Sequence, residues 1–116
     1  MTDVTIYHNP RCSKSRQTLA LIEEKGINPH VVEYLQSPPD AATLGAILNM
    51  LDLQPRELMR VKEAPFGENN LADENLSRDD LIQAMIANPI LIERPIVVSA
   101  GKAVVGRPPE NVLELL

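Results

Sequence analysis

Apolar positions along the first third of the chain follow a strand period, then a helix period, then a strand period again. Val4–Tyr7 is a short β-branched and aromatic run, which is typical of a buried strand. Apolar residues at helical spacing predict a helix over 13–25, and Gly26 follows where a helix C-terminal glycine is expected. A second strand is predicted over 31–34. Two strands joined by one helix predict a parallel, right-handed crossover.

The middle of the chain is predominantly helical by the same criterion. Asp40 is a suitable N-cap for a helix with one apolar face, formed by Leu44, Ile47, Leu48 and Leu51. A short helix is predicted over 55–59, opened by its proline. Residues 62–75 have weak periodicity and are predicted mostly as loop. Ser77 and the carboxylate three positions later predict a capped helix over 77–87.

The last third returns to strands. Apolar runs at 96–98 and 103–105, separated by a turn around Gly101, predict a β-hairpin. A final helix is predicted over 110–115, after two prolines. The resulting order predicts one α/β domain over residues 1–116, a sandwich with a small mixed sheet and a helical insertion at roughly 40–88.

Composition and charge exclude several classes of function. The 116 residues carry a net charge of −5, 3% aromatic residues and no Trp, which argues against a nucleic-acid groove or a polybasic membrane surface. No 18-residue apolar run and no signal-peptide pattern is present. A single cysteine excludes an intramolecular disulfide and a multi-cysteine zinc site, and no metal is expected. We therefore expect a cytoplasmic protein that binds neither nucleic acid nor membrane.

That one cysteine has a distinctive position. Cys12 falls between the first predicted strand and the first predicted helix, where parallel α/β sheets bind their ligands. Helix N–H groups and the helix dipole stabilise a thiolate there and also bind an oxyanion. Arg11, Lys14 and Arg16 surround Cys12 in sequence, and His8 is close. The alternative is that Cys12 is simply a small buried apolar residue.

The neighbours of Cys12 also have plain structural interpretations. His8 could serve only as a structural hydrogen-bonding group, and Ser13 or Ser15 could simply cap the helix. A capping hydroxyl beside the thiolate would also donate a hydrogen bond to it. These interpretations stay open at the level of the residues.

Three more arginines are candidate oxyanion ligands, because a guanidinium matches a tetrahedral oxyanion in a bidentate manner. Arg94 and Arg107 each lie at the edge of a predicted hairpin strand, where side chains can converge on one end of the sheet. Arg60 follows the predicted short helix and could instead compensate its C-terminus. Taken singly, each has the alternative of being a surface charge.

Residues 8–19, His-Asn-Pro-Arg-Cys-Ser-Lys-Ser-Arg-Gln-Thr-Leu, resemble the N-terminal active-site motif of the glutaredoxin-linked arsenate reductase (ArsC) family. The resemblance continues through Arg60, through Glu-Arg-Pro-Ile-Val at 93–97 and through Gly-Arg-Pro-Pro-Glu at 106–110. It covers essentially the whole chain and is strongest to the small bacterial YfgD-like branch of that family.

The resemblance implies a thioredoxin-like three-layer sandwich whose two halves are separated by the helical insertion. Pro95 matches the cis-proline of such folds. The implied roles are a nucleophile, Cys12; a histidine that tunes it, His8; a nearby serine, Ser15; and three arginines that hold the oxyanion, Arg60, Arg94 and Arg107.

The implied reaction is the reduction of arsenate to arsenite, with glutathione as co-substrate, glutaredoxin as protein partner and no bound cofactor. External thiols are required because the chain has no second cysteine. The sequence departs from the family pattern after the cysteine, where Ser13 and Lys14 replace the usual Gly-Thr.

Two other functions are compatible with these residues. An Spx-like regulator that binds RNA polymerase resembles the same fold, but such proteins carry a Cys-x-x-Cys switch, and Ser15 occupies its second position here. A glutathione-dependent thiol reductase of another substrate is the second alternative, and the Ser13-Lys14 departure is compatible with it.

Overall fold

The computed structural model describes residues 3–116 in two compact units. The first, here called the sheet unit, contains residues 3–37 and 94–116, and the second, the helical unit, is Pro38–Glu93. The helical unit is slightly wider than the insertion predicted at roughly 40–88. None of the helices within residues 3–116 has the length and apolar character that a membrane crossing requires.

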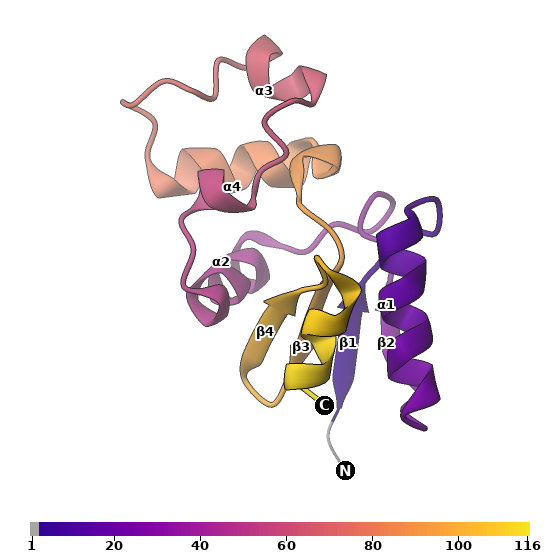
Figure 1. Ribbon diagram of the computed structural model, residues 1–116. Helices are drawn as coiled ribbons and strands as arrows, with labels where there is room; N and C mark the ends of the chain where they lie inside the picture. The colour runs from indigo at the N-terminus through magenta and orange to yellow at the C-terminus, as the bar shows by residue number, and fades with distance from the viewer. Residues whose placement is uncertain (1–2) are drawn as a thin grey trace. The chain divides into compact units, whose positions relative to one another are not determined.

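The sheet unit is an α/β arrangement around four strands (Figure 1). The strand order is β2-β1-β3-β4, with β1 and β2 parallel and the other two pairs antiparallel, which is the predicted small mixed sheet. Its elements are β1 (Val4–Tyr7), α1 (Ser13–Glu24), β2 (His30–Val32), β3 (Ile96–Ser99), β4 (Lys102–Val105) and the 3₁₀ helix η3 (Pro109–Glu114).

One face of this sheet is covered by α1 and η3, which contact each other (Figure 1). Val4 and Ile6 of β1 lie on the same face as Val97 of β3, since side chains alternate along a strand and Ile6 pairs with Val97. These three side chains form a buried core with Ile22 of α1 and Val112 of η3. Burial of this apolar surface fixes α1, and hence its N-terminal end, against β1.

Two elements of the sheet unit differ from their predicted form. β2 ends at Val32 instead of continuing to Tyr34, and Val31 is 41% exposed, because β2 is an edge strand with only one neighbour. Tyr34 is buried although it lies outside the strand. The C-terminal helix is a 3₁₀ helix over Pro109–Glu114 instead of an α-helix.

The helical unit contains the predicted capped helices. α2 (Ala41–Leu51) begins at Asp40, whose side chain accepts a hydrogen bond from the Thr43 N–H at 2.7 Å. α4 (Arg78–Ala87) begins with the predicted capping box of Ser77 and Asp80. The two helices contact each other and have buried apolar residues, which are Leu44, Ile47 and Leu48 on α2 and Leu81, Ile82 and Met85 on α4.

Shorter elements complete this unit: the 3₁₀ helices η1 (Pro55–Leu58) and η2 (Pro89–Leu91), and a helix α3 (Ala64–Glu68). α3 lies within the segment predicted mostly as loop. It buries none of its residues, so it leaves no apolar period in the sequence.

Candidate functional site

The sheet register brings three chain segments to one end of the sheet. Tyr7, the last residue of β1, pairs with Ile96, the first of β3, and Ile96 pairs in turn with Val105, the last of β4. The segments just beyond these three residues therefore leave the sheet at the same end. They are the loop that leads to Cys12, the segment that carries Arg94, and the segment that carries Arg107.

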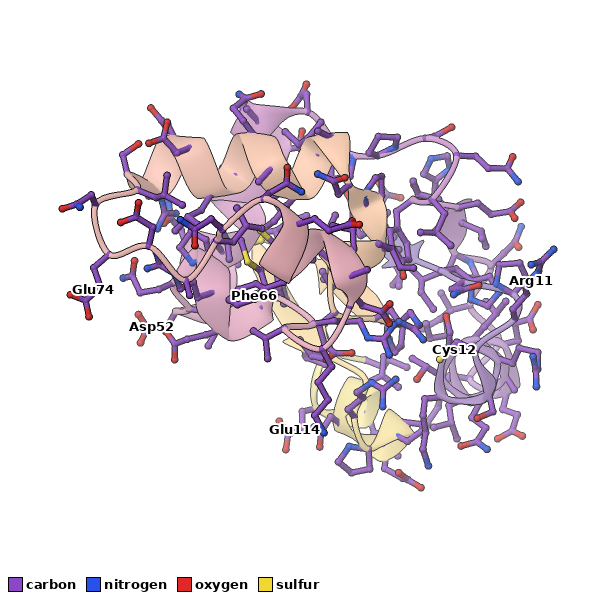
Figure 2. The ribbon with its side chains drawn as sticks, turned by 90° about the horizontal axis from the view of Figure 1, so that it is seen from above. Arg11, Cys12, Asp52, Phe66, Glu74 and Glu114 are labelled. Carbon is purple, nitrogen blue, oxygen red and sulfur yellow. The ribbon has the colours of Figure 1, made fainter. Side chains whose placement is uncertain are left out.

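Cys12 is the N-cap residue of α1, in an extended backbone conformation with φ −93° and ψ 123°. Its N–H donates to the Asn9 carbonyl at 3.0 Å, and its carbonyl accepts from the Arg16 N–H at 3.0 Å. The Cys12 residue is 9% exposed. Figure 2 shows it at the N-terminal end of α1, with Arg11 projecting away from it. The strand-to-helix position predicted for Cys12 is confirmed.

Ser15 organises the loop before Cys12 rather than capping the helix. Its hydroxyl accepts a hydrogen bond from the Asn9 N–H at 3.0 Å and lies 2.6 Å from His8 Nδ1. The alternative interpretation that Ser13 or Ser15 caps the helix is wrong, because Cys12 itself occupies the N-cap position. Asn9 was not singled out in the sequence, although Asn-Pro directly after a strand is a turn signal that could have identified it.

His8 is buried, with 6% of its surface exposed, and burial lowers its pKa. The nearby Glu33 carboxylate opposes this shift, and Arg16 adds to it. The imidazole is therefore neutral at physiological pH. In the contact between His8 Nδ1 and the Ser15 hydroxyl, the donor is set by which ring nitrogen of His8 carries the proton.

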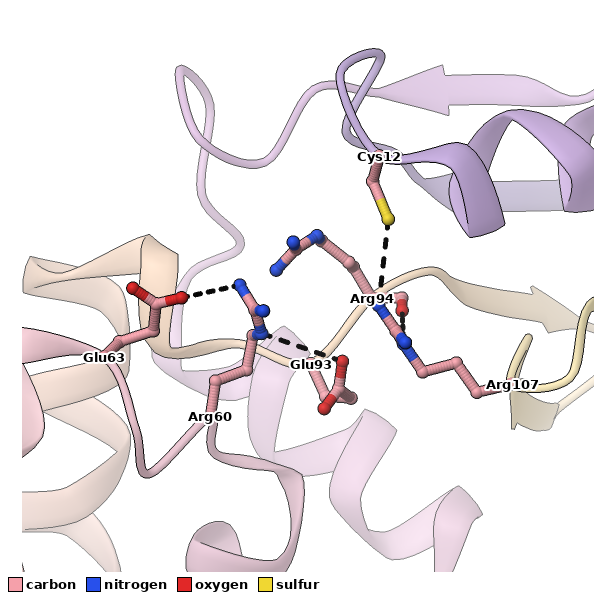
Figure 3. Close-up of polar contacts among 6 residues, drawn as sticks. All are labelled: Cys12, Arg60, Glu63, Glu93, Arg94 and Arg107. Carbon is pink, nitrogen blue, oxygen red and sulfur yellow. Dashed lines mark hydrogen bonds and ion pairs between the residues drawn. The ribbon is translucent and has the colours of Figure 1, made fainter.

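Arg94 and Arg107 supply positive charge next to the thiol (Figure 3). Arg107 Nη2 lies 3.7 Å from Cys12 Sγ, and Arg107 Nε donates to the Arg94 carbonyl at 2.8 Å. The hydrogen bond to the Arg94 carbonyl fixes the orientation of the Arg107 guanidinium toward the sulfur. The predicted convergence of these two arginines on the end of the sheet, beside Cys12, is confirmed.

Several groups act together on the pKa of the Cys12 thiol. Burial raises this pKa, but the backbone N–H groups of Ser15 and Lys14 and the guanidinium of Arg94 lower it, and the net result is a pKa below the ordinary cysteine value. The contributions that lower the pKa of Cys12 come from the backbone N–H groups of the first turn of α1 and from Arg94, rather than from the side chains of Arg11 and Arg16. Arg16 Nη1 instead donates to the Pro10 carbonyl at 2.9 Å.

The peptide bond between Arg94 and Pro95 is cis, as predicted. A second cis bond, between Arg107 and Pro108, was not predicted. Both prolines directly follow the arginines that approach Cys12.

Arg60 belongs to the helical unit, where two carboxylates hold it. Its Nη1 lies 2.9 Å from Glu63 Oε1, and its Nε lies 3.9 Å from Glu93 Oε1 (Figure 3). The Arg60 N–H donates to the Leu91 carbonyl at 2.7 Å. Of the three predicted oxyanion arginines, Arg107 contacts Cys12 and Arg94 lowers its pKa within the sheet unit. Arg60 forms its ion pairs within the helical unit.

Over residues 3–116, no group of three or more His, Cys, Asp or Glu side chains is arranged to hold a metal ion. The sheet-unit site combines a thiol of lowered pKa with guanidinium groups beside it. Such a combination can bind a small anion and can supply a nucleophile.

Comparison with known proteins assigns the chain to a family. The sequence model of the ArsC family matches residues 7–115. The chain is 60% identical over 114 residues to the uncharacterized protein YfgD of Escherichia coli (strain K12), covering 97% of this chain and 96% of that protein. It is 50% identical over 117 residues to an arsenate reductase of Neisseria meningitidis serogroup A, covering 100% of both.

Among solved structures, an arsenate reductase from Vibrio cholerae matches with a TM-score of 0.95 and 52% identity, over 99% of this chain and 98% of that one. The predicted α/β, thioredoxin-like fold with a small mixed sheet is confirmed by this likeness together with the strand order.

Proposed function

Because the chain belongs to the ArsC family, we propose that it is an oxidoreductase that reduces arsenate to arsenite through Cys12. One observation carries the proposal: the only thiol of the chain lies at the N-terminus of α1 with Arg107 Nη2 3.7 Å from its sulfur. A thiolate held this way is a nucleophile for the central atom of a small oxyanion.

In the first step the Cys12 thiolate attacks arsenic. A sulfur–arsenic bond forms, and one arsenate oxygen leaves as water after it is protonated. Arg94 and Arg107 neutralise the charge on the remaining oxygens, and Arg60 is the third arginine of this set. Their guanidinium groups suit a tetrahedral oxyanion because two N–H groups can donate in parallel to two oxygens.

The two electrons that convert arsenic(V) to arsenic(III) come from two external thiols. Glutathione displaces a further oxygen from the Cys12 adduct as water. A glutaredoxin thiol then attacks the glutathione sulfur, the sulfur–arsenic bond of glutathione breaks, and arsenic keeps the electron pair. Water finally hydrolyses the bond between the Cys12 sulfur and arsenic(III), so that the products are arsenite, a mixed disulfide of glutathione and glutaredoxin, water and the regenerated Cys12 thiol. The chain needs partner thiols because it has a single cysteine, and the reaction requires no bound cofactor. A free catalytic thiol fits the reducing cytoplasm.

His8 and Ser15 support the nucleophile in this scheme. The Ser15 backbone N–H lowers the pKa of Cys12. The Ser15 hydroxyl connects the first turn of α1 to the preceding loop, because it contacts His8 Nδ1 and accepts a hydrogen bond from the Asn9 N–H. We propose that His8 acts on the thiol through Ser15, by fixing the first turn of α1. Pro95 has a structural role beside Arg94.

The test is a coupled assay with glutathione, glutaredoxin, glutathione reductase and NADPH. We expect arsenate-dependent NADPH oxidation that falls by at least about 1,000-fold in Cys12→Ser, because the nucleophile is lost. Omitting glutathione or glutaredoxin from the wild-type reaction should also abolish it.

Other results would assign the site differently. If arsenate gives no turnover while Cys12 is alkylated readily at neutral pH, a thiol reductase of another substrate is indicated, consistent with Ser13-Lys14. If Cys12 also resists alkylation, the catalytic role is refuted, and binding to RNA polymerase becomes the function to measure.

A further inference from the structure

Gly106 occupies a position that admits no side chain. Gly106 is buried and lies in the chain between the end of β4 and Arg107. Its N–H donates to the Pro95 carbonyl at 2.9 Å. A Cβ atom placed on Gly106 would lie 2.6 Å from Thr18 Oγ1, 3.1 Å from Thr18 Cγ2 and 2.8 Å from Pro95 Cγ. Two of these separations are shorter than real Cβ contacts, so another residue here must displace its surroundings.

Thr18, the residue that meets Gly106, cannot easily move away. It lies on α1 with 0% of its surface exposed, and its hydroxyl donates to the Lys14 carbonyl at 2.8 Å. As a β-branched residue on a helix, it has few alternative rotamers. α1 is itself fixed by core packing of Ile22.

The contact between Gly106 and Thr18 joins the two segments that carry the candidate site. Thr18 lies in the middle of α1, the helix that Cys12 caps, and Gly106 directly precedes Arg107 in the chain. Any displacement of Gly106 from Thr18 therefore moves the backbone that carries the Arg107 guanidinium, which donates to the Arg94 carbonyl and approaches the Cys12 sulfur.

We propose that Thr18 and Gly106 form a steric stop that sets the separation between the Arg107 guanidinium and the Cys12 sulfur. Both are positioning residues: they act through Arg107. The consequence for arsenate rests on the proposed function above, whereas the consequence for the thiol does not.

The experiment compares Gly106→Ala, the double variant Thr18→Ala/Gly106→Ala, and the control Gly45→Ala. Gly45 lies in α2, and a Cβ there meets only Ile82 Cδ1 at 3.9 Å, an ordinary contact. The first readout is the pH midpoint of alkylation by iodoacetamide, which reports on Cys12 alone because no other cysteine is present. The second readout is the KM for arsenate.

We expect Gly106→Ala to raise the alkylation midpoint by about half a pH unit or more, since the thiolate loses a nearby positive charge. The KM for arsenate should rise about tenfold with a smaller change in kcat, because the oxyanion ligand is displaced. Thr18→Ala removes Oγ1 and Cγ2, which are two of the three close contacts, whereas the contact with Pro95 Cγ remains. The double variant should therefore move both values back toward wild type without reaching it. Gly45→Ala should match wild type.

The proposal is overturned if folded Gly106→Ala keeps the wild-type midpoint, or if the double variant has the same midpoint as Gly106→Ala. If Gly106→Ala does not fold, the double variant decides: a folded double variant supports the stop at Thr18, and an unfolded one refutes it, because the obstruction then lies elsewhere. If the wild type shows no arsenate turnover, the proposed function fails, while the alkylation midpoints still test the stop.

Discussion

Charge is divided unevenly between the two units. Residues 1–37 and 94–116 hold seven Lys or Arg against six Asp or Glu, whereas residues 38–93 hold four against ten. The chain's net charge of −5 therefore arises in the helical unit, and the unit that contains the only thiol is slightly positive. A small anion is recognised by the charge close to its binding site, and the net charge of the whole chain does not report that local charge.

The same contrast applies to individual arginines. Arg107 of the sheet unit contacts the Cys12 sulfur through Nη2 and the Arg94 carbonyl through Nε. Arg60 of the helical unit faces the carboxylates of Glu63 and Glu93. A guanidinium already paired with carboxylates has less influence on a thiol pKa than one that contacts the sulfur.

The largest effect should come from Arg107→Lys. Lysine keeps the charge but cannot donate in parallel to two atoms, so the orientation provided by the Arg94 carbonyl is lost. We expect the KM for arsenate to rise about 10- to 100-fold, with the alkylation midpoint of Cys12 moving upward. Steady-state kinetics and iodoacetamide alkylation measure the two effects.

Arg60→Lys is the matched control in the other unit. It should leave the alkylation midpoint of Cys12 unchanged, whatever it does to the KM for arsenate. Equal midpoint shifts in the two variants would contradict the distinction drawn between the two arginines.

A second, intermediate effect concerns pH. Burial lowers the pKa of His8, so the unfolded chain takes up the His8 proton first as the pH falls. The stability contributed by neutral His8 is thus present above the ordinary histidine pKa and is lost on acidification below it. We expect His8→Gln to reduce the slope of unfolding free energy between pH 7 and 5, by at most the roughly 1.4 kcal/mol per pH unit of one proton.

Urea unfolding at several pH values measures this slope. His30→Gln is the matched control, because His30 is the other histidine of the chain and is exposed on the edge strand β2. An unchanged slope in His8→Gln would show that His8 titrates alike in the folded and unfolded chain.

The smallest effect should come from Glu63→Gln in the helical unit. The Arg60–Glu63 pair is partly solvent-exposed, with side chains 25% and 29% accessible, so its contribution is screened. We expect the free energy of unfolding to fall by about 0.5 kcal/mol or less, and the difference to vanish in high salt. Glu68→Gln, an exposed carboxylate on α3, is the control; a loss above about 1.5 kcal/mol would contradict this weak pairing.

The sequence predicted best those elements whose local signals agree. α2 and α4 each combine an apolar face with a capping residue, Asp40 or Ser77, and both begin where predicted. α3 has neither a buried face nor a capping side chain, and for that reason it was not predicted. β2 was predicted too long because an edge strand ends where its single neighbour stops pairing. The residues of β2 themselves carry no signal for that end.

At the candidate site, local signals placed Cys12, and the predicted hairpin placed Arg94 and Arg107 at one end of the sheet. Cys12 at the strand-to-helix junction follows from two periodicities that meet at one place. The cations next to Cys12 in sequence were a weaker guide, because Arg16 bonds to the Pro10 carbonyl. The capping interpretation left open for Ser15 did not hold, because its hydroxyl contacts His8 Nδ1 and the Asn9 N–H.

The amino-acid sequence by itself determined that one thiol begins a helix directly after a strand, because hydrophobic period and capping are encoded within a few residues. The tertiary structure decided which groups surround that thiol. Arg107 is 95 positions from Cys12, and it reaches the sulfur because β1, β3 and β4 pair in a register that ends at one edge of the sheet. Register and close contacts such as Gly106 against Thr18 depend on packing between distant segments, which no local pattern specifies.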